Sequence, residues 1–383
     1  MKRRHFLTTT LSLPASALLA EAPAKPSAPA PVPTQPAAAK PAPPKPPVWH
    51  DVAPFVEGRG WADEKRSRYY DRFPAVAEGK VPAPVWDLSR DSAGMAVRFK
   101  SNASHIKVRY TLFRDRMALP HMPATGVSGV DLYAKDKKGK WRWVGVSRPE
   151  KKEGTGDLSG AIPAEPREWM LYFPLFNGIE KLEIGVNEGA AFEGLTPRPK
   201  PLVFYGTSIT HGASASRPGM VHTAILGRKL DRPVMNLGFS GNGKMDASVG
   251  ELMTRLDPAL YIIDCNPNMT APLIRERCIP LVKQLRAARP HTPVVLVEDR
   301  RNTNSWIRPE RSQHHSDNHA ALKEAFASLQ KEGMTRLFYI PGDYLLGHDA
   351  DGATDGSHPN DLGFMRQAEA FEPVLKDALK VAG

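Results

Sequence analysis

Residues 201–212 read PLVFYGTSITHG, a short apolar run that ends in a glycine-containing turn and a polar segment. The run 202–205 has the length and apolar character of a buried strand, and the turn 206–208 follows it directly. Residues 218–229 then have the pattern of a helix. A buried strand that leads through a tight turn to a helix indicates an α/β fold with a mainly parallel sheet.

The same alternation of strand and helix continues to the end of the chain. Further apolar strands are predicted at 234–237, 260–264, 294–297 and 337–340, and further helices at 272–288, 318–331 and 361–381. Pro280 is expected to kink or split the first of these helices. We therefore predict one α/β domain over residues 197–383, in which ligands bind beyond the carboxyl ends of the strands.

The preceding block, residues 49–196, has a different pattern of short alternating segments broken by Gly, Pro, Asn and Asp. Strands are predicted at 96–99, 106–112, 130–133, 141–146, 169–173 and 182–186. No long helical period interrupts them, so the block is predicted to be a β-sandwich of jelly-roll type. Its tryptophans suit either core packing or stacking on sugar rings: Trp86, Trp141, Trp143 and Trp169.

The N-terminus has the features of an export signal. Residues 1–22 combine a basic start, a moderately apolar stretch and small residues near the end. Arg3 and Arg4, followed by His-Phe-Leu, resemble a twin-arginine signal, and an ordinary secretory signal is the alternative. Residues 23–48 form an Ala/Pro-rich linker that cannot build a core. A periplasmic or secreted location is expected.

Composition excludes several classes of protein. The 383 residues carry 52 Lys plus Arg against 41 Asp plus Glu, but the basic residues are scattered and form no nucleic-acid motif, so no nucleic-acid partner is expected. No apolar run reaches the roughly 20 residues that span a bilayer, so no membrane span is expected. Cys265 and Cys278 are too few for a disulfide scaffold or a four-cysteine metal site, and they form either one disulfide or two free thiols.

Three polar residues in the α/β domain suit nucleophilic catalysis. Ser208 follows the first strand, where a tight turn can present its hydroxyl. Asp355 and His358 lie three residues apart, just before the last helix, so the carboxylate can orient the imidazole. A serine hydroxyl needs such a base before it can attack a carbonyl.

Two further loops can stabilise developing negative charge. The loop 236–243 contains Gly241 among residues whose backbone N–H groups can turn toward a ligand. The loop 264–268 ends in Asn268, whose amide can donate a hydrogen bond. Such donors around a developing oxyanion form an oxyanion hole.

These segments together resemble the SGNH (GDSL-type) hydrolases. Residues 205–212 look like the first sequence block of that family, and residues 129–133, Gly-Val-Asp-Leu-Tyr, match the Gly-x-Asp-Leu-Tyr signature of the N-terminal domain in a two-domain group. The resemblance implies a flavodoxin-like three-layer sheet with Ser208 as nucleophile. It also implies an oxyanion hole made by the N–H groups of Ser208 and Gly241 and the amide of Asn268.

The chain departs from the family pattern in two blocks. The first reads Gly-Thr-Ser-Ile instead of Gly-Asp-Ser-Leu, and the third reads Asn-Pro-Asn-Met, so that Asn266 competes with Asn268 as the oxyanion donor. His211 and Arg217 are weaker candidates for substrate contact, and a structural role is the plainer interpretation of each. His314, His315, Asp317 and His319 resemble a metal cluster only by composition, so neither a metal nor another cofactor is expected.

The sequence thus predicts an exported serine esterase that removes short acyl groups, most simply acetyl, from a carbohydrate. Two alternatives remain open. One is a lipase or thioesterase that acts on longer acyl esters, and the other is a catalytically silent glycan-binding protein. The identity of the carbohydrate and the oligomeric state are not encoded in any pattern we recognise.

Overall fold

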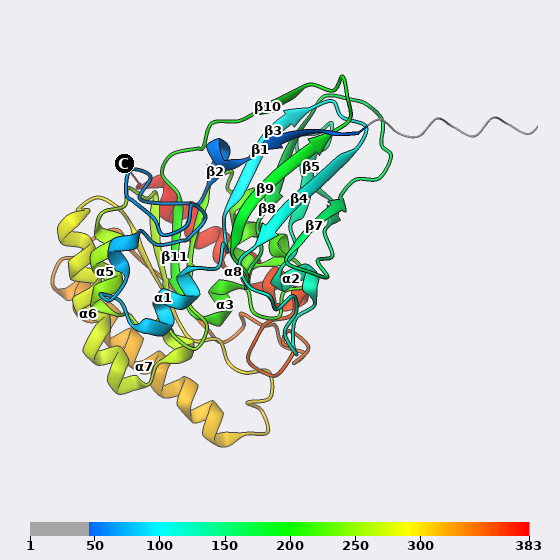
Figure 1. Cartoon of the computed structure of the whole chain (residues 1–383). Coiled ribbons are helices and arrows are strands. Elements are labelled where there is room, and N and C mark those ends of the chain that lie inside the picture. The colour runs from blue at the N-terminus through cyan, green and yellow to red at the C-terminus, as the bar shows by residue number, and fades with distance from the viewer. Residues whose placement is uncertain (1–45, 383) are drawn as a thin grey trace, which may run out of the picture. The chain divides into compact units, whose positions relative to one another are not determined.

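The computed structural model describes residues 46–382, so the predicted signal and most of the linker lie outside the described residues. The α/β part is built on β11 (Leu202–Gly206), the strand predicted from the apolar run. β11 lies between two parallel neighbours in a five-stranded sheet of order β12-β11-β13-β14-β15 (Figure 1). The other strands of this sheet are β12 (Val234–Gly238), β13 (Leu260–Asp264), β14 (Val294–Val297) and β15 (Leu337–Ile340).

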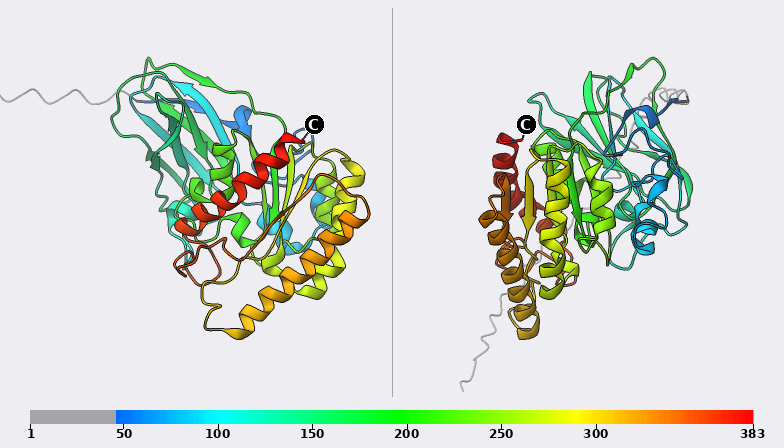
Figure 2. Two further views of the ribbon diagram at one scale, coloured as in Figure 1. Left: turned by 180° about the vertical axis from the view of Figure 1, so that it is seen from behind. Right: turned by 90° about the vertical axis from the view of Figure 1, so that its left-hand side faces the viewer.

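Helices cover both faces of this sheet because each buried strand is apolar on both sides. They are α3 (Ser208–His211), α4 (His222–Lys229), α5 (Ala247–Thr254), α6 (Ala271–Ala288), α7 (Pro309–Lys331) and α8 (Asp361–Lys380). In β11, Val203 and Tyr205 pack with α5, α6 and α7, whereas Leu202 and Phe204 pack with α4 and α8. Figure 2 shows this layering, with α8 in red and α7 in orange on opposite faces. The predicted three-layer α/β fold is confirmed.

Several local predictions for the α/β part need correction. Pro280 lies inside a continuous α6 and does not split it, because packing against α5 and α7 outweighs the roughly 3 kcal/mol cost of an interior proline. α7 begins at Pro309, nine residues before the predicted start, and α5 was not predicted. Cys265 and Cys278 are both buried free thiols, which is one of the two states that the sequence left open.

The N-terminal block contains two antiparallel sheets that share a core, as predicted. The first has the order β1-β9-β4-β7, and the second has the order β10-β3-β8-β5-β6 with β2 paired to β3. Their bounds are β1 (Val48–Asp51), β2 (Val56–Glu57), β3 (Ala96–Ser101), β4 (Ile106–Leu112), β5 (Asp131–Lys135), β6 (Trp141–Val146), β7 (Glu153–Asp157), β8 (Arg167–Tyr172), β9 (Ile179–Val186) and β10 (Phe192–Gly194). β1, β2, β7 and β10 were not predicted; β7 reads EGTGD and has no apolar alternation to detect.

The segment between β2 and β3 packs mainly against the α/β part, while its Tyr70 and Met95 belong to the core of the sandwich. Trp61 and Phe73 belong to the same core as β11, and the indole Nε1 of Trp61 donates to the carbonyl of Leu252 at 3.0 Å. The short α1 (Ala83–Ser89) contributes Val85 to that core. The N-terminal block is therefore joined to the sheet by buried apolar contacts. Among residues 46–382, no helix has the length and apolarity needed to cross a membrane.

The Gly-x-Asp-Leu-Tyr segment supplies a polar link between the two parts. Asp131 is fully buried and accepts from the backbone N–H of Gly219 at 2.8 Å, from Arg217 at 2.9 Å and from the indole of Trp143 at 2.8 Å. Burial raises the pKa of Asp131, and the Arg217 charge opposes that rise. The hydroxyl of Tyr133 also accepts from Arg217, at 2.5 Å. The signature residues thus hold the loop that precedes α4.

We expect Asp131→Ala to lower the free energy of unfolding by about 3–5 kcal/mol, because Arg217 and two N–H donors would lose their partner in a buried place. Denaturant unfolding of the variant and the wild type measures the difference. The control is Glu193→Ala, which removes an exposed ion pair with Lys100 at 3.6 Å and should cost at most about 1 kcal/mol. Equal losses in both variants would contradict the assigned role of Asp131.

Candidate active site

Ser208 lies at the first position of α3, directly beyond the carboxyl end of β11. The turn needs glycine at position 206, because a Cβ there would come within 2.1 Å of the Thr210 hydroxyl oxygen. Thr207 caps the helix by accepting the N–H of Ile209 at 3.3 Å. Ser208 is only 6% exposed, so its backbone is fixed by packing. The N–H groups at a helix start have no partner inside the helix, which leaves them available to a ligand.

His358 and Asp355 complete a hydrogen-bonded chain with Ser208. The Nε2 of His358 lies 2.8 Å from the Ser208 hydroxyl oxygen, and its Nδ1 lies 2.7 Å from a carboxylate oxygen of Asp355. The other carboxylate oxygen accepts the N–H groups of Ser357 and His358, at 3.0 and 2.8 Å. Partial burial disfavours the charged carboxylate, but these hydrogen bonds prevail and lower the pKa of Asp355 to about 2. An ionised Asp355 keeps a proton on Nδ1, so that Nε2 faces the serine as an acceptor.

The glycine-rich loop after β12 packs directly against the serine turn. The N–H of Phe239 donates to the carbonyl of Gly206 at 3.0 Å, and a Cβ on Gly243 would come within 1.9 Å of the same carbonyl oxygen. Gly241 has φ +69° and open space around its Cβ position. Glycine at position 243 therefore lets the loop pack closely against Gly206, two residues before Ser208.

Arg72, from the segment before β3, supports this loop from inside. Its side chain is fully buried, and Nη1 donates to the carbonyls of Asn236 and Gly238 at 2.9 and 2.7 Å. Burial lowers the pKa of Arg72 to about 10, a value at which the group stays charged at neutral pH. The N-terminal block thereby fixes the carboxyl end of β12. Sequence reasoning missed Arg72 because an isolated arginine carries no recognisable pattern.

The structure brings Asn268 to the glycine-rich loop and keeps Asn266 inside the protein. The Asn268 side-chain amide donates to the carbonyl of Asn242, next to Gly241. Asn266 is fully buried, and its side-chain amide has no hydrogen-bond partner among the described residues. Of the two asparagines, Asn268 is the one that contacts the glycine-rich loop, and its role as oxyanion donor stays a prediction.

Asn268→Ala is expected to lower kcat for 4-nitrophenyl acetate by about 10²–10³, because one donor to the oxyanion is lost. KM should change much less, since the ground-state carbonyl binds this donor weakly. Asn268→Asp keeps the shape of the side chain but replaces the donor by a negative charge, so this variant should lower kcat at least as much. A rise in KM with unchanged kcat would contradict this role.

The two weaker candidates have structural partners. His211 is fully buried, and its ring stacks on Phe176 with centroids 4.0 Å apart, which favours the structural role that the sequence analysis preferred. Burial, and then the nearby Arg72 charge, lower the pKa of His211 well below its usual value. Arg217 pairs with Asp131, as described above, so the structure gives this side chain a structural partner.

The histidines of α7 are distributed among separate partners. His315 bonds to Asp299 at 2.8 Å and His319 contacts Glu298 at 3.3 Å. Within residues 46–382, no group of three or more His, Cys, Asp or Glu side chains is arranged to hold a metal ion.

His121 is a neighbour of the catalytic chain that the sequence did not indicate. It comes from the loop between β4 and α2 (Ala124–Val127), and its ring lies 5.9 Å from the ring of His358. Partial burial and the neighbouring His358 lower the pKa of His121, and Asp355 opposes this shift. The N-terminal block therefore contributes a side chain to the rim of the site. A single loop histidine gives no signal that would have found it.

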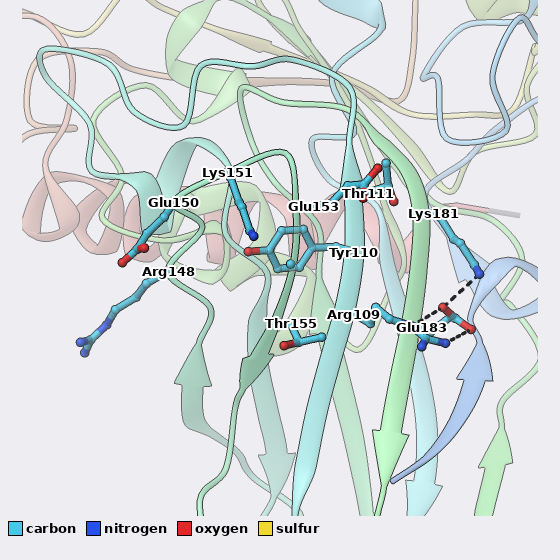
Figure 3. A pocket seen from close by; sticks show the side chains of 11 residues that line it. Arg109, Tyr110, Thr111, Arg148, Glu150, Lys151, Glu153, Thr155, Lys181 and Glu183 are labelled. Atoms are coloured by element: carbon cyan, nitrogen blue, oxygen red, sulfur yellow. Dashed lines mark hydrogen bonds and ion pairs between the residues drawn. The ribbon is translucent and has the colours of Figure 1, made fainter. Parts of the chain in front are cut away.

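Five cavities that we measured within residues 46–382 are lined by residues other than Ser208 and His358. A cavity of about 820 Å³ lies instead on the sandwich, between β4, β7 and β9 (Figure 3). Its charges are already partly paired, because Glu183 binds both Arg109 and Lys181.

Two family models match the sequence. The GDSL-like lipase/acylhydrolase family matches residues 199–376, and the GxDLY family, the N-terminus of SGNH-hydro-type esterases, matches residues 48–192. A search of curated protein sequences finds no match.

Solved structures resemble the whole described chain. A protein from Bacteroides ovatus assigned as a GDSL-like lipase is 32% identical, with a TM-score of 0.81, over 87% of this chain and 98% of its own. The salicylyl-acyltransferase SsfX3 from a tetracycline biosynthetic pathway is 17% identical, with a TM-score of 0.67, over 86% of this chain and 97% of its own. An acetyl xylan esterase from the rumen bacterium Butyrivibrio proteoclasticus is 11% identical, with a TM-score of 0.54, over 88% and 100%. The acyltransferase and the acetyl xylan esterase resemble this chain in fold alone.

The chain belongs to the GDSL-like lipase/acylhydrolase family of SGNH-type hydrolases, with a GxDLY N-terminal domain, and it is an esterase.

Proposed function

We propose that the protein removes acetyl or similarly short acyl groups from a carbohydrate through a serine acyl-enzyme. The observation that carries the chemistry is the continuous chain of short hydrogen bonds from Ser208 through His358 to Asp355. The acetyl group and the carbohydrate are both supported by fold similarity to an acetyl xylan esterase.

In the first half-reaction, the Ser208 oxygen attacks the ester carbonyl carbon while its proton moves to Nε2 of His358. The carbonyl oxygen becomes an oxyanion, held by the N–H groups of Ser208 and Gly241 and by the Asn268 amide. The intermediate then collapses. The bond to the sugar oxygen breaks, and His358 returns the proton to that oxygen, so the alcohol leaves and the acyl group stays on Ser208.

In the second half-reaction, water attacks the acyl carbon and gives one proton to His358. The bond to the serine oxygen breaks, His358 returns the proton to Ser208, and the carboxylic acid leaves. Asp355 remains ionised throughout and stabilises the imidazolium of His358.

The test is acetate release from acetylated xylan, acetylated glucomannan and acetylated pectin, together with 4-nitrophenyl esters of two to twelve carbons. The proposal predicts release from at least one polysaccharide and highest kcat/KM on the shortest nitrophenyl esters. Preference for the long esters would favour the lipase or thioesterase alternative. Binding to a polysaccharide without any ester turnover would favour the silent glycan-binding alternative.

We also propose that residues 1–22 direct export by the twin-arginine route. Replacing both Arg3 and Arg4 by Lys in the full chain should leave the precursor inside the cell, as cell fractionation would measure. Unchanged export of this variant would assign the segment to the ordinary secretory route. Retention of the wild type in the cytoplasm would overturn the proposed location.

A further inference from the structure

The most exposed large apolar side chains of residues 46–382 come from two loops beside the catalytic turn. Trp306 is 78% exposed, Tyr344 is 67% exposed and Ile307 is 62% exposed. Trp306 and Ile307 lie between β14 and α7, and Tyr344 lies between β15 and α8. Both loops follow the carboxyl ends of parallel strands, where ligands of such sheets bind. Large apolar side chains exposed on loops in this position indicate a binding surface.

The loop that carries Trp306 is bonded directly to the catalytic turn. The N–H of Thr303 donates to the carbonyl of Gly356 at 2.8 Å, and Gly356 lies between Asp355 and His358 in the sequence. Gly356 has φ +89°, and a Cβ at this position would come within 2.9 Å of the Asn304 side chain. The turn and the loop therefore fit closely against each other, and Trp306 follows three residues after Thr303 in this loop.

Buried side chains hold this loop in place from behind. His315 is 5% exposed, bonds to Asp299 through Nδ1 at 2.8 Å and accepts the N–H of Asn302 through Nε2 at 3.2 Å. Arg301 joins the two loops through an ion pair with Asp343 at 2.6 Å. The exposed aromatic side chains thus stand on a supported backbone and not on a free loop.

A cavity of about 320 Å³ lies between the two loops. Its lining includes Asn302, Thr303, Ser305 and Trp306 from one loop and Asp343 and His348 from the other. The ring of His348 lies against Tyr344, with centroids 4.4 Å apart. The cavity therefore combines flat aromatic faces with several hydrogen-bonding groups.

We propose that this cavity, together with Trp306, is a subsite that holds the sugar unit next to the acylated one in a polysaccharide. This rests on the proposed function, which it deepens. A sugar ring has an apolar face of C–H groups that can stack on an indole, and hydroxyls at its edge that can bond to amide, hydroxyl and carboxylate groups. A hydrocarbon chain would cover the indole but leave those polar groups without partners. The cavity of Figure 3 offers no comparable aromatic surface, because Tyr110 is only 6% exposed.

The experiment compares Trp306→Ala, Trp306→Phe and Trp306→Leu with the wild type. The substrates are the acetylated polysaccharide that the wild type hydrolyses fastest among xylan, glucomannan and pectin, and an acetylated monosaccharide. Trp306→Ala should lower the ratio of the two kcat/KM values, polymer over monosaccharide, about tenfold or more, mainly through KM for the polymer. Trp306→Phe should keep most of the wild-type ratio of kcat/KM values. Trp306→Leu should lower the ratio as Trp306→Ala does, because only an aromatic ring presents a flat face.

Val381→Ala is the matched control. Val381 is also an exposed apolar residue, 41% exposed, but it lies at the opposite end of α8 from His358, about 30 Å along the helix. Its ratio should equal that of the wild type. An unchanged ratio in Trp306→Ala, or full recovery by Trp306→Leu, would overturn the sugar subsite while the proposed function stands. If the wild type releases acetate from 4-nitrophenyl acetate but from none of the polysaccharides, the proposed function fails and the subsite fails with it.

Discussion

Replacing Ser208 by Ala will lower kcat/KM for 4-nitrophenyl acetate by about 10⁵–10⁶, and replacing His358 by Ala will have a similar effect. The hydroxyl and the imidazole work as one unit, because the serine proton moves to the Nε2 that lies 2.8 Å away. Without either group the attack on the carbonyl is lost, so the double variant should be no slower than the single variants. Any rate of the variants above that of uncatalysed hydrolysis would come from the oxyanion hole and from substrate binding.

The measurement is the release of nitrophenol under steady-state conditions and in a pre-steady-state burst. The wild type should show a burst if deacylation is the slower step, and Ser208→Ala should show none. Ser248→Ala, a serine in α5 of the same part of the chain, should keep its rate within about twofold. If the single losses multiply in the double variant, Ser208 and His358 act independently and the assigned mechanism is wrong. Thermal unfolding of each variant checks that the fold is kept.

Residues close together in the sequence accounted for most of the fold and the central chemistry. The run 202–205 predicted β11 because a buried parallel strand is apolar on both faces. The pairing of Asp355 with His358 could also be predicted from local sequence, because a spacing of three residues can bring a carboxylate to an imidazole. Ser208 was found through its place at a strand end. The distance from Asp355 to His358 is set by a few backbone bonds, whereas the fold brings Ser208 to His358, which lies 150 positions later in the chain.

Contacts between distant segments could not be predicted in this way. Arg72 supports a loop more than 160 positions later in the chain, at Asn236 and Gly238. His121 reaches His358 only because the sandwich packs against the sheet. The sequence also directed attention to the tryptophans of the sandwich, of which Trp169 is buried in the core. The most exposed tryptophan, Trp306, lies in the α/β part, and only tertiary structure shows that its loop contacts the catalytic turn.

Replacing Asp355 by Asn will lower kcat/KM for 4-nitrophenyl acetate by about 10³–10⁴ at neutral pH. The variant keeps the size of the side chain but loses its charge. An asparagine amide can donate to Nδ1 of His358, which favours the tautomer with its proton on Nε2. That nitrogen can then no longer accept the Ser208 proton. Asp351→Asn, an exposed change in the same loop, is the control and should keep its rate within about twofold.

The low pKa of Asp355 determines how the activity and the stability of the wild type respond to pH. Because the pKa of Asp355 is lowered to about 2, the carboxylate is charged throughout the range from pH 4 to 9. Its protonation therefore cannot produce a loss of activity in that range. A lowered carboxylate pKa stabilises the folded protein at pH values above the ordinary pKa of about 3.8. This stabilisation is lost as the pH falls toward 2. Asp355→Asn should lack this contribution, so the stabilities of the wild type and the variant should approach each other as the pH falls below 3.8 and converge only below about pH 2. Retention of activity by Asp355→Asn within tenfold of the wild type would show that the imidazole is oriented by another group.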